Sequence, residues 1–157
     1  MNTIRCAVIG TGNMGYAHAS HLYGGNVQGM TLSAVCDLDE AKRANCAQKF
    51  PGVRVYEDYH QLLADGVADA VIVAVPHPLH SIVAMEALQT GHHTLVEKPI
   101  DVSLSQAEKL CETARKTDRV FVIMLNQRTS PIFRRAREIV QSGQLGKLKR
   151  SVWIITN

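Results

Sequence analysis

Six short apolar runs alternate with segments of helical periodicity along most of the chain, and this alternation restricts the fold more than any other feature. The runs carry few charges, as expected for strands that are buried on both faces of a sheet. Strands joined by helices in this way lie parallel and connect through right-handed crossovers. The pattern predicts an α/β fold, a doubly wound parallel sheet of strand order 3-2-1-4-5-6. The expected strands span residues 4–10, 30–37, 53–56, 69–76, 92–99 and 119–126, and the expected helices span residues 13–24, 39–50, 58–65, 78–91, 103–117 and 130–143.

The final segment, residues 148–157, alternates like a further strand but has no following partner in the sequence. An unpaired strand with exposed apolar side chains such as Trp153 tends to associate with another chain. We therefore expect a first domain over residues 1–128, followed over residues 129–157 by a connecting helix and the first strand of an incomplete second domain. Self-association into a homo-oligomer is a further expectation.

Composition argues against two classes of partner. The sequence has 157 residues, with 17 Lys+Arg against 14 Asp+Glu and 5% aromatic residues. Because the basic residues are dispersed and aromatic side chains for base stacking are scarce, we expect no nucleic-acid partner. No apolar stretch is long enough to span a membrane, and no charged leader precedes the first strand. We therefore expect a cytoplasmic protein without a membrane partner.

The cysteines and histidines do not predict a metal site. The four cysteines are far apart and form no C-x-x-C pair, which is typical of reduced core residues. The pairs His18/His21 and His77/His80 have the i, i+3 spacing that places both rings on one helix face. Neither pair has an obvious third ligand nearby, and a catalytic zinc ion needs three.

A glycine-rich turn joins the first expected strand to the first expected helix. The turn Gly10-Thr11-Gly12-Asn13-Met14-Gly15 matches the pattern G-x-G-x-x-G. In a dinucleotide-binding Rossmann domain the first glycine permits the tight turn, the second admits the pyrophosphate, and the third lets the helix pack closely on the strand. Backbone N–H groups and the positive end of the helix then face the phosphates. All the residues of this turn are therefore candidate cofactor-binding residues.

An acidic residue, Asp37, ends the second expected strand, 22 residues after the last glycine of the turn. A carboxylate in this position accepts hydrogen bonds from the adenosine ribose and repels a 2′-phosphate, which favours NAD as the cofactor. Lys42 and Arg43 lie close enough in the sequence to keep NADP as an alternative.

Two other interpretations of the turn compete with dinucleotide binding. One is a turn whose glycines serve only the backbone, although this leaves the position of Asp37 unexplained. The other is a methyltransferase that binds S-adenosylmethionine, which also has a glycine-rich turn and an acid after its second strand. The third glycine, and six strands without an antiparallel seventh, count against the methyltransferase.

Polar groups follow the last three strands, at the sheet edge where ligands bind in this fold class. An ordinary loop explains any one of them, but their shared position favours a ligand site. The plain alternative for Glu97 and Lys98 is a surface ion pair. The three groups are Val75-Pro76-His77, Glu97-Lys98-Pro99 and Asn126-Gln127-Arg128.

Several stretches of the chain resemble the glucose-fructose oxidoreductase, inositol dehydrogenase and MocA (Gfo/Idh/MocA) family of NAD(P)-dependent oxidoreductases. The E-K-P motif in this setting is the most specific, and His77 departs from the asparagine or threonine that the family often carries there. Together the stretches run through nearly all of the chain. They are "AVIGTGNMG", "VIVAVPHPLH", "AMEALQTGHHTLVEKPI" and "QSGQLGKLKRSVW".

The resemblance implies a role for each group at the sheet edge. Glu97 is expected near the nicotinamide ribose, and Lys98 is expected to be the catalytic lysine beside the nicotinamide C4. Val75, Pro76 and His77 are candidate cofactor-binding residues. Asn126 and Gln127 either orient the nicotinamide carboxamide or bond the loop backbone, and His80 either lines the site or caps its helix.

The resemblance also implies an activity. The family includes NAD(P)-dependent dehydrogenases of sugars, polyols and related hydroxy compounds, whose substrate pocket is in a second α/β domain. Lys98 would exchange the proton of the substrate hydroxyl as hydride moves to or from the nicotinamide. We expect this chain to be the cofactor-binding portion of such an enzyme and inactive alone, with a non-catalytic dinucleotide-binding or assembly module as the alternative.

Overall fold

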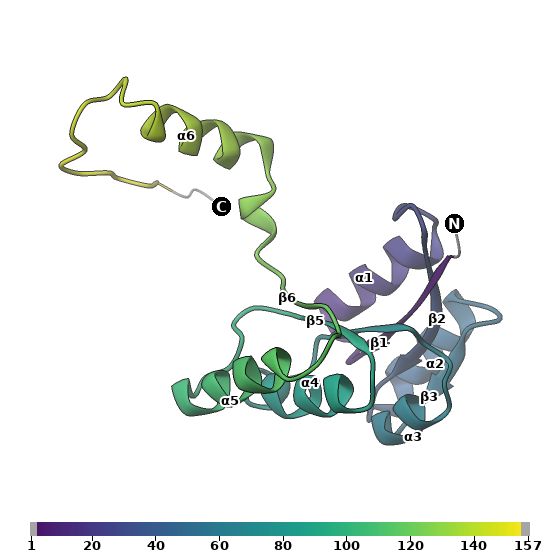
Figure 1. The fold of residues 1–157 in the computed structure, drawn as a ribbon. Coiled ribbons are helices and arrows are strands. Elements are labelled where there is room, and N and C mark those ends of the chain that lie inside the picture. Colours follow the sequence, from purple (N-terminus) through teal and green to yellow (C-terminus); the bar gives the residue numbers. More distant parts are fainter. Residues whose placement is uncertain (1–2, 155–157) are drawn as a thin grey trace. The chain divides into compact units, whose positions relative to one another are not determined.

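A parallel sheet forms the centre of the computed structural model, which describes residues 3–154. Its strands are β1 (Ile4–Ile9), β2 (Met30–Cys36), β3 (Arg54–Tyr56), β4 (Ala70–Val73), β5 (His93–Val96) and β6 (Phe121–Ile123). They lie in the order β3-β2-β1-β4-β5-β6, and every neighbouring pair is parallel (Figure 1). The predicted doubly wound α/β fold and its strand order are thereby confirmed.

The helices occupy the positions that the sequence periodicity predicts. They are α1 (Asn13–Tyr23), α2 (Glu40–Lys49), α3 (Tyr59–Ala64), α4 (His80–Gln89), α5 (Leu104–Arg115) and α6 (Pro131–Gln141), with 3₁₀ turns η1 (His77–Leu79) and η2 (Asn126–Arg128). Leu22 of α1 and Cys46 of α2 are buried on one face of the sheet, whereas Leu62 of α3, Val83 of α4 and Leu110 of α5 are buried on the other. Within residues 3–154, no helix combines the length and apolar character that a membrane crossing requires.

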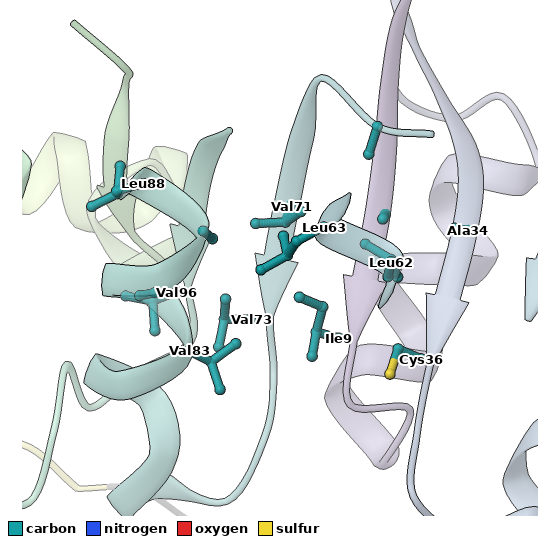
Figure 2. Packing of buried hydrophobic residues seen from close by; sticks show 14 of the residues in the cluster. Ile9, Ala34, Cys36, Leu62, Leu63, Val71, Val73, Val83, Leu88 and Val96 are labelled. Atoms are coloured by element: carbon teal, nitrogen blue, oxygen red, sulfur yellow. The ribbon is translucent and has the colours of Figure 1, made fainter. Parts of the chain in front are cut away.

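Strand β1 shows why the central strands read as continuous apolar runs. Its side chains point alternately to the two faces of the sheet, and helices cover both faces. Cys6 and Val8 therefore pack on the side of α1 and α2, whereas Ala7 and Ile9 pack on the opposite side. Figure 2 shows Ile9 among the buried residues on the side of α3, α4 and α5, together with helix residues that include Leu62, Leu63 and Val83.

The order of the strands also positions a ligand site. The chain leaves β1 toward β2 on one side, and β4 pairs with β1 on the other. The loops that follow β1 and β4 therefore separate at the carboxyl edge of the sheet and leave a crevice between them. The glycine-rich turn and residues 74–76 are these two loops.

The chain divides into two units, Met1–Met124 and Leu125–Asn157. In the second unit, Phe133 of α6 stacks on Trp153 with 5.4 Å between the ring centroids. Residues 148–154 have no regular secondary structure, so the predicted strand is wrong over these residues, and residues 155–157 lie outside the described part. A strand needs a neighbouring backbone to pair its N–H and C=O groups, and the described residues of this unit contain no such neighbour.

Candidate cofactor-binding site

Two of the three motif glycines are required by the packing of the turn itself. Gly10 has a φ of +87°, and a Cβ added there would lie 2.6 Å from the carbonyl oxygen of Ala74. A Cβ on Gly15 would lie 1.8 Å from the carbonyl oxygen of Gly10. Any side chain at either position would therefore push α1 or the β4 loop away from β1.

Gly12 has no such packing reason to be glycine. Its φ of −64° is open to any residue, and a Cβ added there would meet no heavy atom within 4 Å. Gly12 is also the N-cap of α1 and makes no side-chain cap to the first turn of the helix, which contains Asn13 and Met14. The space beside Gly12 and the uncapped helix end together suit the phosphates of a ligand.

Asp37 is held in place by the turn. Its Oδ2 accepts hydrogen bonds from the Thr11 backbone N–H at 2.7 Å and the Thr11 hydroxyl at 2.9 Å, and its Oδ1 accepts one from the Asp39 N–H at 3.0 Å. The Thr11 N–H is thus bonded to Asp37 and is not directed at a phosphate. Each carboxylate oxygen can accept more than one hydrogen bond, so Asp37 keeps acceptor capacity for ribose hydroxyls.

The charge of Asp37 is stabilised despite its partial burial. Burial by itself raises the pKa of the Asp37 carboxyl. The hydrogen bonds from Asp39 and Thr11 and the charge of Lys42 together lower the pKa by a larger amount, so it lies below its ordinary value. The Lys42 Nζ lies 3.9 Å from Asp37 Oδ2. Asp37 is therefore an anion at neutral pH.

Arg43, one of the two cations that keep NADP as an alternative, is engaged elsewhere. Its guanidinium donates hydrogen bonds to the carbonyl oxygens of Asp37 at 3.0 Å and Leu38 at 2.8 Å, and it pairs with Glu57 at 3.1 Å. A 2′-phosphate would have to compete with these acceptors while facing the Asp37 carboxylate. The arrangement favours NAD over NADP.

Two hollows meet at Gly12 in the first unit. The larger is a cleft of about 920 Å³ that extends from Gly10 and Asp37 to Tyr59, Leu79 and Val83. The smaller has a volume of about 220 Å³. It is lined by the predicted residues Asn13, Met14, Val75, His77, His80, Glu97 and Lys98. Because Gly12 lines both hollows, they form one elongated site. Asp37 lies in the larger hollow and Glu97 in the smaller one.

Glu97 and Lys98 do not form the surface ion pair that was the plain alternative. Glu97 is buried with 5% of its surface exposed, and its Oε1 lies 2.8 Å from His18 Nε2. Its Oε2 accepts a hydrogen bond from the Lys98 backbone N–H at 3.1 Å. The Lys98 side chain is exposed and has no carboxylate within ion-pairing distance among residues 3–154. Its ammonium is thus free to meet a ligand in the smaller hollow.

His80 lies behind the site, where it holds two loops together. Its ring is 1% exposed, with Nδ1 2.6 Å from the carbonyl oxygen of Pro99 and Nε2 2.8 Å from that of Val75. Both ring nitrogens are therefore occupied by backbone, and neither is available to a cofactor. His77, by contrast, is exposed and lines the smaller hollow, and Pro76 is exposed and lines the larger cleft.

Asn126 and Gln127 belong to the second unit, where they form η2, and their contact with the cofactor stays a prediction. His18, which the sequence suggested only as half of a metal-ligand pair without a third ligand, bonds the site residue Glu97. The feature that could have pointed to His18 is its position three residues after Gly15, which places it on the same face of helix α1 as that glycine. Within the described residues, no group of three His, Cys, Asp or Glu side chains is arranged to hold a metal ion.

Removing the charge of Asp37 is expected to weaken the discrimination between the two dinucleotides. Asp37→Asn keeps most of the size and one acceptor, so the ratio of NADPH to NADH dissociation constants should fall by about 10-fold or more because the 2′-phosphate no longer faces an anion. Calorimetric titration with each dinucleotide measures this ratio. Glu40→Gln, which removes an exposed negative charge from the start of α2, is the control and should leave the ratio unchanged.

The contribution of Asp37 to NAD⁺ binding should persist under mildly acidic conditions. Because the folded-state pKa of Asp37 is lowered, its charge is lost only as the pH falls through that lowered value. NAD⁺ is the ligand for this measurement, because the 2′-phosphate of NADPH takes up a proton at about pH 6. The ratio of NAD⁺ dissociation constants between Asp37→Asn and the unsubstituted protein should therefore be constant from neutral pH down to the ordinary titration range of aspartate. A ratio that already declines above that range would contradict the assignment of Asp37 as a ribose-binding anion.

Comparison with known proteins matches most of the chain to one family. The model of an oxidoreductase family with an NAD-binding Rossmann fold, Gfo/Idh/MocA, matches residues 4–125. A scyllo-inositol 2-dehydrogenase (NAD(+)) of Bacillus subtilis is 30% identical over 144 residues, which are 92% of this chain and 42% of that protein. An inositol 2-dehydrogenase of Rubrobacter xylanophilus is 34% identical over 144 residues, 91% of this chain and 41% of that protein.

Solved structures agree with this match. The scyllo-inositol dehydrogenase from Lactobacillus casei, crystallised with NAD(H) and scyllo-inositol, superposes with a TM-score of 0.86 at 26% identity, over 92% of this chain and 43% of the other. The chain thus spans less than half the length of the relatives it matches. The NAD-binding Rossmann fold of the family, together with the NAD(H) bound in the Lactobacillus casei structure, confirms the prediction of NAD as the cofactor.

Proposed function

The chain belongs to the Gfo/Idh/MocA family of oxidoreductases, as its motifs predicted, and from this premise we propose that it is the cofactor-binding portion of an NAD-dependent dehydrogenase of sugars or polyols. The observation that carries the proposal is the elongated site that meets at Gly12, with Asp37 at one end and the exposed Lys98 ammonium toward the other. This arrangement suits a ligand with an adenosine half, a central pyrophosphate and a reactive second half.

The residues present suit NAD along the whole site. The open position beside Gly12 and the uncapped N–H groups of α1 would hold the pyrophosphate, and Asp37 would bind the adenosine ribose. Bound NAD supplies the hydride acceptor that no side chain can provide. Val75 and His77, which line the smaller hollow, would complete the nicotinamide end within the first unit.

Lys98 would handle the proton of the reaction. When a secondary alcohol is oxidised, hydride leaves the carbon and a proton leaves the oxygen. The Lys98 amine would accept that proton during oxidation and return it during reduction. Since Glu97 bonds the Lys98 backbone N–H and not its ammonium, the side chain stays free for this exchange.

The substrate class rests on the relatives. Several are inositol dehydrogenases, and one that is 32% identical over 146 residues is a D-glucoside 3-dehydrogenase of Escherichia coli. We propose that the first domain, residues 1–128, binds the cofactor and that residues 129–157 begin the substrate domain. A cytoplasmic location and self-association remain predictions.

Calorimetric titration of the protein with NADH and with S-adenosylmethionine tests the cofactor half of the proposal. We expect saturable 1:1 binding of NADH and no binding of S-adenosylmethionine, because the third glycine and Asp37 match a dinucleotide site. Binding of S-adenosylmethionine alone would support the methyltransferase and refute the proposal. Binding of NADH without turnover of any polyol or sugar by the complete protein would instead favour a dinucleotide-binding module.

A further inference from the structure

A buried hydrogen bond joins helix α1 to the E-K-P segment. His18 Nε2 lies 2.8 Å from Glu97 Oε1, although the two residues are 79 positions apart in the sequence. Only 16% of the His18 side chain and 6% of the Glu97 side chain are exposed. With Glu97 as a carboxylate, His18 Nε2 is the donor of this bond, because a carboxylate accepts hydrogen bonds and does not donate them.

Glu97 needs this partner. A buried carboxylate without hydrogen bonds is costly, and within residues 3–154 His18 is the only side chain that bonds it. The second oxygen of Glu97 accepts from the Lys98 backbone N–H at 3.1 Å. With one oxygen on His18 and the other on Lys98, the carboxylate is fixed in orientation and cannot turn toward the Lys98 ammonium.

His80 fixes the other end of the same segment. Its Nδ1 bonds the carbonyl oxygen of Pro99, the residue after Lys98. The neighbouring Ser81 also bonds Asp101 through its hydroxyl group. Loss of His18 should therefore release Glu97 and the start of the segment, whereas these contacts retain the rest of the loop.

We propose that His18 is a positioning residue for the nicotinamide half of the cofactor, acting through Glu97, which lines the smaller hollow and bonds the Lys98 backbone N–H. This inference rests on the proposed function, because it assumes that Lys98 faces the nicotinamide. The adenosine half lies beyond Gly12, on Asp37, and His18 is not among the residues that line that cleft. Losing the bond should thus affect the binding of NAD⁺ and leave the binding of ADP, which lacks the nicotinamide riboside, almost unchanged.

Two amide substitutions separate the hydrogen bond from the mere presence of a polar side chain. The amide nitrogen of glutamine reaches about as far as His Nε2, whereas that of asparagine is one methylene shorter. We expect His18→Asn to weaken NAD⁺ binding by about 10-fold and ADP binding by less than about 2-fold, and His18→Gln to restore most of the NAD⁺ affinity. His21→Asn is the matched control, since His21 is exposed on the same helix and contacts Asn26.

Thermal unfolding first verifies that each variant of the complete protein folds. Calorimetric titration with NAD⁺ and with ADP then gives the two affinities. In a Glu97→Ala background, where no acceptor for His18 remains, the His18→Asn substitution should have less than about a 2-fold further effect on NAD⁺, because its action passes through Glu97. Equal losses for NAD⁺ and ADP, or no loss, in His18→Asn would overturn the proposal, and so would failure of His18→Gln to recover NAD⁺ affinity. Failure of the unsubstituted protein to bind NAD⁺ would instead refute the proposed function.

Discussion

Replacing Lys98 with alanine is expected to lower the turnover of a polyol or sugar by about 10²–10⁴-fold, the usual contribution of a general acid or base. The affinity for NAD⁺ should change by less than about 3-fold. The reason is that Lys98 contributes its ammonium to the smaller hollow, whereas Gly12, Asp37 and the start of α1 hold the remainder of the dinucleotide. Steady-state assay of the complete protein on a panel of inositols and sugars, together with NAD⁺ titration, measures both quantities.

Lys98→Arg separates charge from proton exchange. Arginine keeps a cation in the hollow but does not release its proton in the pH range of the assay. We therefore expect Lys98→Arg to bind NAD⁺ normally and to remain as inactive as Lys98→Ala. Lys109→Ala, at an exposed position on α5, is the control for loss of a surface charge. Full activity of Lys98→Ala would eliminate Lys98 as the proton-transfer group.

The second large effect is expected at Gly12, where stability and cofactor binding should separate. Gly12→Ala introduces a methyl group that meets nothing within 4 Å and that suits the local φ of −64°. The free energy of unfolding should therefore change by less than about 1 kcal/mol, because the entropic gain from alanine is offset by its poorer fit at the N-cap of a helix. NAD⁺ affinity should fall by about 10- to 100-fold, because the methyl group occupies the space that the pyrophosphate needs, at a cost of about 1–3 kcal/mol.

Gly15→Ala is the complementary variant. Its Cβ would lie 1.8 Å from the Gly10 carbonyl oxygen, a contact that only a shift of α1 can relieve. The resulting loss of about 3 kcal/mol in the free energy of unfolding exceeds the gain of about 1 kcal/mol that alanine brings to a helix. Urea unfolding monitored by circular dichroism, combined with NAD⁺ titration, distinguishes the two variants. If Gly12→Ala bound NAD⁺ as tightly as the unsubstituted protein, the pyrophosphate would not lie beside Gly12.

The sequence was sufficient for the architecture of the first unit. Apolar runs that are buried on both faces, helical segments between them and the fixed hand of the crossovers leave few arrangements besides the observed strand order. The sequence separation of Gly15 and Asp37 predicted that the acid lies beside the glycine-rich turn. The turn follows the first strand and Asp37 follows the second, and these two parallel strands end at the same edge of the sheet. These features follow from local periodicity and chain chirality, which a single sequence contains.

Residues 148–154 show where the local pattern is insufficient. They alternate like a strand, yet they form none, because a strand exists only when another backbone pairs with its N–H and C=O groups. The alternation describes one partner of that pairing and does not specify the other. For the same reason, a self-association through this segment stays a prediction.

The side-chain contacts of the site were decided by the tertiary structure alone. His18 meets Glu97 across 79 residues, Thr11 bonds Asp37, and the ring of His80 turns inward to the carbonyl oxygens of Val75 and Pro99. Such contacts depend on how closely α1 and α4 pack on the sheet and on which buried polar atoms then need a partner. The sequence by itself determined the fold and the positions of the turn, the acid and the lysine. Only the packed structure decided which neighbours hold them, because a buried donor and acceptor must meet within about 3 Å, and sequence spacing does not specify a distance that short.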